Sequence, residues 1–465
     1  MTFWDAAFSL PTLSLLFLAI ALIVAFGFEF INGFHDTANA VTTVIYTRTL
    51  QPTPAVLYSG TMNFLGALLT VLVGSAAVAF SIVNLLPVDL LIEANSNAAL
   101  VMVLSLLVAG VVWNLSTWAV GLPVSSSHTL IGSILGVGIA NSLWLGQGLL
   151  GVNWAKAGEV GLGLLISPLI GFVAAGAMLL CLRRLVKEPR LYQPPVGDDR
   201  PPGWIRAVLI ATCGGVSFAH GSNDGQKGMG LLLLVLVGFM PVHYGLTVNR
   251  PEMAPEVFAA VAEIRDVYQK YQIPVSGPLD QDLIILKNEL DGKTNFRDVK
   301  DKWPLRKAIF RTTLALKQAE SDSATPGEAK SELKALREKL IPAVEFVPIW
   351  VVFGTAVALG VGTTIGYKRI MVTVAEKIGK THLTYAQGAA AESVAAATIM
   401  LADIAHLPVS TTQVLSSGVA GTMAANHSGI QGGTCRKILL AWVLTLPACV
   451  VLAAGLFTIG RLIVR

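Results

Sequence analysis

Charged side chains are scarce in this chain of 465 residues. Asp, Glu, Lys and Arg together make up only 13% of the sequence, whereas hydrophobic residues make up 54%. A soluble protein of ordinary composition carries about 25% charged residues, so the scarcity of charge argues against a soluble globular protein. Many windows reach the roughly 20 apolar residues that one helical crossing of a bilayer requires. The composition therefore predicts an all-α polytopic membrane protein.

Cysteine and clustered basic charge are also scarce. The four cysteines lie far apart, without a CxxC or other metal-ligand spacing, and we interpret them as small packing residues. No basic run is long enough to indicate nucleic-acid binding, and the net charge is only +4. The first apolar run lacks the basic residues that precede the core of a cleaved signal peptide, so we expect it to be retained as a helix.

Ten apolar segments follow one another along the chain. They cover residues 11–45, 55–80, 98–119, 121–141, 159–182, 204–240, 348–370, 387–405, 406–426 and 437–460. The first and sixth are longer than one crossing and are interrupted by polar residues. The fourth and ninth begin with polar clusters, so each is either a full span or a re-entrant hairpin.

The distribution of Lys and Arg predicts the orientation. If both termini lie outside, the inner loops hold thirteen Lys and Arg residues and the short outer segments hold three. Because loops on the cytoplasmic side carry the excess of positive charge, we expect both termini to be periplasmic in a bacterial cytoplasmic (inner) membrane.

Residues 241–345 lack any run long enough to span a membrane. Stretches such as PEVFAAVAEIRDVYQKY combine helical periodicity with interleaved charges, which predicts a helical extramembrane insert of undefined role. The expected organisation is a first transmembrane repeat (1–183), a basic cytoplasmic linker (184–203), the start of a second repeat (204–240), the insert (241–345) and the remainder of the second repeat (346–465).

Two polar segments within the apolar regions resemble each other. GLPVSSSHTLIGS (121–133) and HLPVSTTQVLSSG (406–418) align at an offset of 285 residues, and GFHDTANA (33–40) aligns more weakly with GSNDGQKG (221–228) at an offset of 188. The offsets differ by about the length of the insert, so one insertion reconciles both alignments. Two halves of five spans each must enter the membrane from opposite sides, which predicts an inverted-topology repeat with broken or re-entrant helices.

The duplicated clusters of hydroxyl side chains follow duplicated prolines. Pro123 and Pro408 are each suited to begin a helix, and a helix N-terminus rich in hydroxyls is suited to bind an oxyanion. The alternative is that these hydroxyls bond back to their own helices. The predicted substrate-binding residues of the clusters are Ser125, Ser126, Ser127, Thr129, Ser410, Thr411 and Thr412.

Ionisable residues inside apolar segments are costly and are candidates for function. Asp36 and Asp224 occupy equivalent positions of the weaker repeat and offer oxygen ligands for a metal ion, or carboxylates that take up a proton. Lys227 is placed either to pair with Asp224 or to face an anionic substrate, and a purely structural ion pair is the alternative. Further candidates for binding the coupling ion or proton are Glu29, His35, Asn39, His128 and Asn223, with Glu392 and Asp403 as additional proton-relay candidates.

These motifs resemble the inorganic phosphate transporter family, in particular its bacterial low-affinity members. The matching segments are INGFHDTANAVTTVIYTR (31–48), GLPVSSSHTLIGSILG (121–136), SFAHGSNDGQKGMG (217–230), EKIGKTHLTYAQG (376–388), LPVSTTQVLSSGVAGTM (407–423) and AWVLTLP (441–447). The resemblance implies a secondary active transporter that imports inorganic phosphate by alternating access. It also implies that phosphate travels as a neutral complex with a divalent metal such as Mg²⁺, together with protons. Coupling to Na⁺ is the alternative.

Three residues depart from the family pattern. His35 and Lys227 replace asparagines of the two short motifs, which resembles the proton-linked branch and weakens the case for two symmetric sodium sites. Gln413 stands where the second cluster usually has histidine, which puts a histidine role there in doubt. The resemblance implies no permanently bound cofactor, and the oligomeric state is left open, with a homodimer as one alternative.

Two other classes of protein remain as alternatives. One is a channel lined by broken helices, although paired titratable groups favour coupled transport. The other is a membrane enzyme such as a lipid phosphatase that uses His128, but no nucleophile with a matching base and acid stands out beside it.

Overall fold

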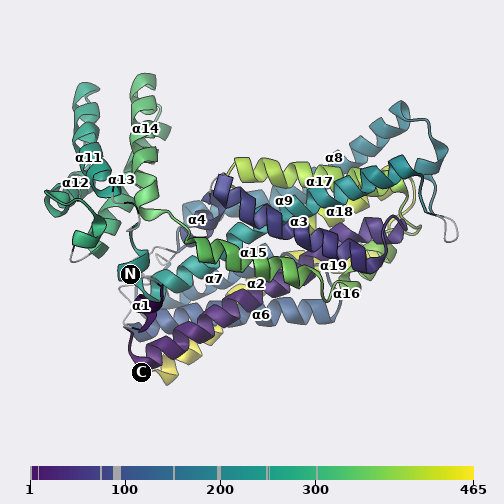
Figure 1. Cartoon of the computed structure of the whole chain (residues 1–465), viewed down its shortest axis with the longest axis horizontal. Helices are drawn as coiled ribbons and strands as arrows, with labels where there is room; N and C mark the ends of the chain where they lie inside the picture. The colour runs from purple at the N-terminus through teal and green to yellow at the C-terminus, as the bar shows by residue number, and fades with distance from the viewer. Residues whose placement is uncertain are drawn as a thin grey trace. The chain divides into compact units, whose positions relative to one another are not determined.

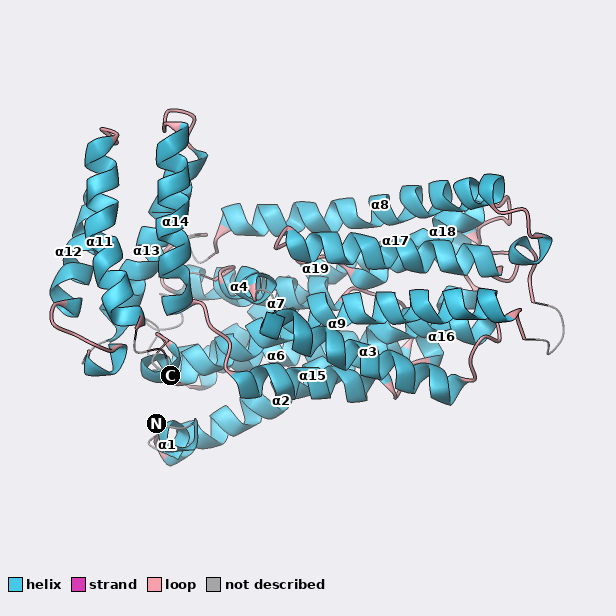
Figure 2. Cartoon of the chain, turned by 45° about the horizontal axis from the view of Figure 1, so that its top comes forward, coloured by secondary structure: helices cyan, strands magenta, loops and turns pink. Residues whose placement is uncertain are grey.

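The computed structural model describes residues 3–8, 10–73, 76–86, 96–149, 152–195, 200–247, 250, 252–299 and 302–464. Among these residues the regular elements are helices, apart from one isolated β-bridge between Gly379 and Ile430 (Figure 2). The chain forms two compact units. The insert unit comprises Met1–Leu15 and Leu236–Val347, and the membrane unit comprises Leu16–Val235 and Pro348–Arg465.

The membrane unit is a bundle in which long helices run alongside one another (Figure 1). Two of its helices, α2 and α9, continue into the insert unit. Its elements are α2 (Thr12–Tyr46), α3 (Pro52–Val73), α4 (Ala77–Val83), α6 (Ser96–Ala119), α7 (Ser126–Trp144), α8 (Trp154–Leu185), η1 (Pro189–Tyr192), α9 (Gly203–Phe239), α15 (Ile349–Thr363), α16 (Lys368–Glu376), α17 (Tyr385–Ile404), α18 (Thr411–Ala425) and α19 (Gly432–Ile463).

Helices occupy all ten segments that the sequence predicts to be apolar spans. Within the described residues, α2, α3, α6, α8 and α19 are each long and apolar enough to cross a membrane on their own. Their outward faces suit hydrocarbon, since Leu165 on α8 is 74% exposed and Val443 on α19 is 71% exposed. The segment 55–80 is divided between α3 and α4 instead of forming one helix.

Packing within the membrane unit follows a repeated scheme. Helix α7 packs against α19 and α6, and α6 also packs against α19. In the same way, α18 packs against α8 and α17, and α17 also packs against α8. Helices α3 and α15 pack against each other. Exchanging α6 with α17, α7 with α18 and α8 with α19 therefore reproduces the same set of neighbours. The exchanged helices α8 and α19 also each contain an internal proline, Pro168 and Pro447.

The polar motifs of the first and sixth apolar segments do not interrupt their helices. Helix α2 runs for 35 residues and α9 for 37 residues, each straight through its motif. Gly221 in α9 allows the backbones of α9 and α3 to lie close together and does not unwind the helix. A Cβ at this position would lie 2.1 Å from the Asn63 carbonyl oxygen of α3. The polar side chains of the motifs contact neighbouring helices. The backbone of α2 and α9 therefore keeps its helical hydrogen bonds through both motifs.

The insert unit has a hydrophobic core of its own. It contains α1 (Phe3–Phe8), α10 (Pro241–Tyr244), α11 (Met253–Lys270), α12 (Gly277–Leu290), η2 (Phe296–Asp298), α13 (Lys302–Ser321) and α14 (Gly327–Val344). Apolar residues such as Leu283, Phe296 and Leu336 are buried between α11, α12, α13 and α14. The buried Arg306 side chain donates to the carbonyl oxygens of Gly245 and Val344, which joins the two ends of this helical segment. The described part of residues 241–345 is mainly helical, as predicted, whereas its place outside the membrane stays a prediction.

Candidate functional site

A helix begins in each duplicated cluster, but at Ser126 and Thr411 and not at the prolines, and each helix is preceded by a buried serine as its N-cap. The Ser125 hydroxyl accepts a hydrogen bond from the His128 N–H at 3.2 Å, and the Ser410 hydroxyl accepts one from the Gln413 N–H at 3.2 Å. Both serines have extended backbone, with φ and ψ of −90° and 115° at Ser125 and −94° and 100° at Ser410. These are N-caps, which hold the start of each helix in place. The chain before each cap is not helical, so two helix starts lie buried inside the bundle.

The two aspartates come together around a histidine. His220 Nε2 on α9 lies 3.1 Å from Asp224 Oδ2 and 3.9 Å from Asp36 Oδ2 of α2. All three side chains are buried, and one ligand atom from each lies within 4.8 Å of the others. On its other side, His220 Nδ1 lies 2.8 Å from Asn63 Oδ1 on α3, which fixes the orientation of the ring.

Lys227 connects α9 to both serine and threonine clusters. Its ammonium group donates to Ser127 Oγ at 2.7 Å, to the Val409 carbonyl oxygen at 2.5 Å and to Asp224 Oδ1 at 2.5 Å. The residue is only 3% exposed. A buried ammonium group is tolerated only when it is paired and fully hydrogen-bonded, and the three contacts come from α7, α9 and the segment before α18. The lysine is therefore held at the meeting point of the two clusters.

The threonines of the second cluster contact the two aspartates. Thr412 Oγ1 donates to Asp36 Oδ1 at 2.5 Å, and Thr411 Oγ1 donates to Asp224 Oδ2 at 3.3 Å. His35 Nδ1 lies 3.0 Å from the same Asp36 oxygen. The start of α18 is thus tied to both α2 and α9. Direct contact of these hydroxyls with a substrate stays a prediction, because here they donate to carboxylates.

Several other predicted residues lie in or beside this network. Thr129 Oγ1 donates to the Ser125 carbonyl oxygen at 3.2 Å, which is the back-bonding alternative. Ser126 Oγ and His128 Nδ1 are buried and make no hydrogen bond within the described part of the chain. Such buried polar atoms without partners are costly, so both are available to a bound ligand.

Two further candidates, Glu29 and Asn223, lie at the edges of the network. Glu29 is fully buried on α2 against Gly228 of α9. The Asn223 amide donates to Asp403 Oδ1 at 2.5 Å, which links α9 to α17. Asn39 belongs to α2, but its side chain lies outside the described residues. Glu392, also predicted as a proton-relay residue, is buried on α17 and accepts a hydrogen bond from Thr212 Oγ1 at 2.6 Å.

His220 was not among the site residues predicted from the sequence. The signal was present, because His220 and Asp224 are four residues apart and therefore share one face of a helix. Alignment of the two short motifs begins at Gly221, one residue beyond this histidine, so the comparison of repeats excluded it.

The site has the donors that a divalent cation needs. Asp36 and Asp224 supply carboxylate oxygens, which Mg²⁺ prefers, and hydroxyl oxygens of Thr411 and Thr412 lie against them. His220 adds a nitrogen that suits either a softer metal or a proton. Lys227 holds one oxygen of Asp224, so a cation at that oxygen has to displace the ammonium group.

A helical bundle with apolar outer faces and a buried set of charged groups at two helix starts defines a membrane transport protein. Comparison with known protein families supports this class, because the sequence model of the phosphate transporter family matches residues 32–453 of this chain. The chain belongs to this family.

Similar proteins extend over nearly the full chain. The low-affinity inorganic phosphate transporters PitB and PitA of Escherichia coli (strain K12) are each 40% identical to it. The alignments cover 96% of this chain and 97% of PitB, and 97% of this chain and 98% of PitA. A solved structure described as the sodium-dependent phosphate transporter shares the fold, with a TM-score of 0.56 and 21% identity over 96% of this chain and 99% of that one.

Proposed function

We propose that this protein imports inorganic phosphate across the bacterial inner membrane, coupled to protons, with phosphate carried as a complex with a divalent cation. The observation that carries the proposal is the buried series Asp36, His220, Asp224 and Lys227, which contacts both duplicated clusters. A site with cationic, anionic and titratable groups in direct contact is suited to bind a cation, an anion and a proton together. The relatives named as low-affinity phosphate transporters support phosphate as the anion.

The anion would bind at the side of Lys227. The ammonium group, the Ser127 hydroxyl and the N–H groups at the starts of α7 and α18 provide donors that suit a phosphate oxygen. The unpartnered Ser126 hydroxyl lies at the same helix start. In the present arrangement Lys227 is satisfied by Asp224, so phosphate has to compete with that carboxylate for the ammonium group.

The cation would bind at the side of the aspartates. When Lys227 turns to phosphate, Asp224 loses its positive partner, and a divalent cation shared with Asp36 would restore the charge balance. Binding of the anion and binding of the cation then favour each other. This mutual dependence supports transport of phosphate and metal as one neutral complex.

Protons would be carried by the His220–aspartate group. His220 lies between two carboxylates, and its imidazole can gain and lose a proton. A metal ion between Asp36 and Asp224 repels a proton on the imidazole, so the negative charge of phosphate bound beside Lys227 is needed for the cation and the proton to be held together.

Alternating access would use the repeated packing of the membrane unit. The exchange of α6, α7 and α8 with α17, α18 and α19 supports two halves related by an inverted repeat. The two helix starts at Ser125 and Ser410 would then face each other across one central site, and small movements of the halves would open it to one side at a time. The positive-inside distribution supports periplasmic termini.

Replacing Asp36 by asparagine tests the proposal. D36N removes the charge needed for cation and proton binding but keeps the size of the side chain. We expect phosphate uptake into cells that lack other phosphate transporters to fall at least a hundredfold, because a broken buried charge network costs about 3–5 kcal/mol. The matched control is D280N, since Asp280 is an exposed residue of the insert unit. Normal uptake by a membrane-inserted D36N variant would remove Asp36 from the mechanism.

A further inference from the structure

A cavity lined by arginines lies away from the transport site, at one end of the membrane unit. It has a volume of about 750 Å³ and lies between the end of α2, the start of α3 and the start of α9. None of the described residues assigned above to phosphate, cation or proton binding lines it. Its lining residues are Ile45, Tyr46, Arg48, Thr49, Leu50, Gln51, Pro52, Pro54, Arg200, Arg206 and Met371.

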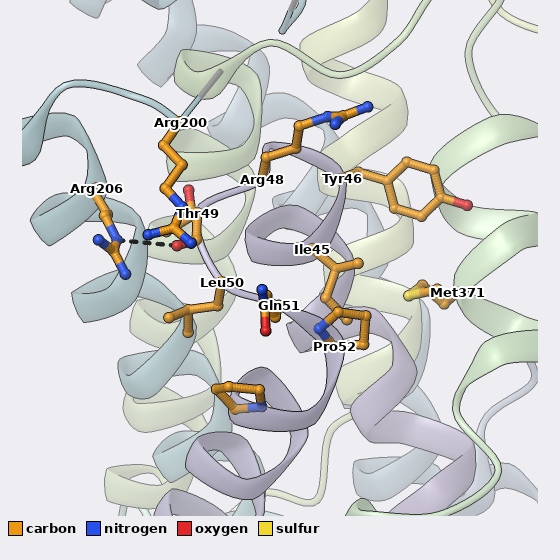
Figure 3. Close-up of a pocket in the computed structure, with 11 residues that line it drawn as sticks. Ile45, Tyr46, Arg48, Thr49, Leu50, Gln51, Pro52, Arg200, Arg206 and Met371 are labelled. Atoms are coloured by element: carbon orange, nitrogen blue, oxygen red, sulfur yellow. Dashed lines mark hydrogen bonds between the residues drawn. The ribbon is translucent and has the colours of Figure 1, made fainter. Parts of the chain in front are cut away.

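Three arginines make this cavity strongly basic. Figure 3 shows the side chains of Arg200 and Arg206 extending toward Thr49, while that of Arg48 extends in a different direction. Arg206 Nε donates to the Thr49 carbonyl oxygen at 3.1 Å. Each guanidinium group has five N–H donors, so this bond leaves most of the Arg206 donors for another acceptor. No acidic residue is among the described residues that line the cavity.

Apolar residues also line the cavity, and exposed apolar residues lie on the adjoining helices. Leu50, Pro52 and Met371 line the cavity beside the arginines. On the adjoining helices, Leu57 of α3 is 55% exposed and Trp204 of α9 is 51% exposed. Tryptophan is favoured where hydrocarbon meets the polar headgroup region, so Trp204 indicates that the cavity lies at that level.

We propose that this cavity binds the headgroup of an anionic phospholipid. The arginines would hold the phosphate by paired hydrogen bonds, and the acyl chains would lie along the exposed apolar residues of α3 and α9. A free phosphate ion would also pair with the arginines, but it would gain nothing from contact with the apolar residues of the cavity and of the adjoining helices. A zwitterionic headgroup would bring its own cationic group close to Arg200 and Arg206, which would repel it, so an anionic headgroup is favoured.

The bound lipid would join two helices that carry the transport site. The cavity touches the end of α2, which bears Asp36, and Arg206 lies on α9, which bears Asp224. At present the direct contact across the cavity is the bond from Arg206 to Thr49. A headgroup on the arginines would add further links between these helix ends and would restrain their relative movement.

The test compares lipids on the full-length protein, purified in neutral detergent and stripped of lipid. Phosphatidylglycerol, phosphatidylcholine with the same acyl chains, and inorganic phosphate are each titrated, and bound ligand is measured by native mass spectrometry alongside the melting temperature. The variants are R200Q, which keeps the Arg206 bond to Thr49, and the double variant R200Q/R206Q. The control R184Q/R190Q removes two exposed arginines that do not line the cavity.

We expect the wild-type protein and the control to retain phosphatidylglycerol in preference to phosphatidylcholine. R200Q should bind phosphatidylglycerol about fivefold more weakly, as expected for one basic residue at an anionic headgroup, and the double variant should bind it more weakly still. Equal retention by R200Q, R200Q/R206Q and the control would overturn the proposal. Stabilisation by inorganic phosphate but not by phosphatidylglycerol, lost in R200Q, would assign the cavity to free phosphate and also overturn it.

Discussion

Lys227 is the residue on which the charge balance of the transport site depends. Its ammonium group is buried and contacts a carboxylate, a hydroxyl and a carbonyl oxygen from three different segments. Removing one partner of such a buried group leaves the others unpaired, which costs more than the bond itself. The position therefore tolerates little change in charge.

K227Q should abolish transport. Glutamine keeps hydrogen-bonding capacity but leaves Asp224 without its positive partner and phosphate without a cation to bind. We expect uptake of labelled phosphate to fall about a hundredfold, from a loss of about 3 kcal/mol or more. The matched control is K156Q, because Lys156 pairs with Glu159 at a site remote from the network. Uptake within twofold of wild type by K227Q would contradict the role of Lys227 in anion binding.

His220 should determine how uptake depends on pH. H220N keeps a group that can bond to Asn63 but removes the titrating imidazole between the two aspartates. We expect the rate of uptake by H220N to vary less than that of wild type between about pH 5 and 8, where histidine ordinarily titrates. The measurement is the initial rate of uptake at fixed external phosphate over that range. A variant with lower activity but an unchanged pH profile would show that the histidine is only structural.

At the scale of elements, the contact between α3 and α9 positions the site. Ser59 Oγ lies 2.7 Å from Ser217 Oγ, and Thr70 Oγ1 donates to Ser222 Oγ at 2.8 Å, on either side of the bond between Asn63 and His220. These polar contacts require the two backbones to lie close together. Gly221 provides that closeness, because only glycine fits against the Asn63 backbone.

G221A tests this contact. The added Cβ would lie 2.1 Å from the Asn63 carbonyl oxygen, so α9 has to move away from α3 and His220 moves with it. Overpacking of this kind costs about 1–3 kcal/mol, and we expect a lower melting temperature by size-exclusion analysis of heated protein, together with reduced uptake. In the control, G161A, the new methyl group has no neighbour within 4 Å. Equal stability of the two variants would contradict the account of the interface.

The positions of the helices could be predicted from local sequence, whereas the contacts among Asp36, His220, Asp224 and Lys227 could not. Pro123 and Pro408 predicted a helix start at each cluster, but the helices begin three residues later, after the N-caps Ser125 and Ser410. The continuity of α2 and α9 was missed, since it depends on partners such as Asn63 that come from another helix. His220 was missed for a similar reason, because its position between Asp36 and Asp224 depends on how α2 and α9 pack.

At the scale of the whole molecule, the two kinds of unit differ in what holds them together. The insert unit has a hydrophobic core with charged outer faces, as in a soluble helical domain. The membrane unit also has a buried apolar core, but it buries polar and charged groups within that core and exposes apolar side chains outside. The apolar outer surface fits a bilayer as solvent, and the buried polar groups place the chemistry inside the bundle.

Phosphate uptake by purified protein in liposomes tests the central claim most directly. Labelled phosphate is supplied under an imposed pH gradient or an imposed sodium gradient, each with and without Mg²⁺. The account predicts uptake that requires both the pH gradient, acidic outside, and Mg²⁺, and that is abolished by a protonophore. Uptake that follows the sodium gradient alone, without Mg²⁺ or a pH gradient, would contradict it and would make Asp36 and Asp224 sodium ligands instead.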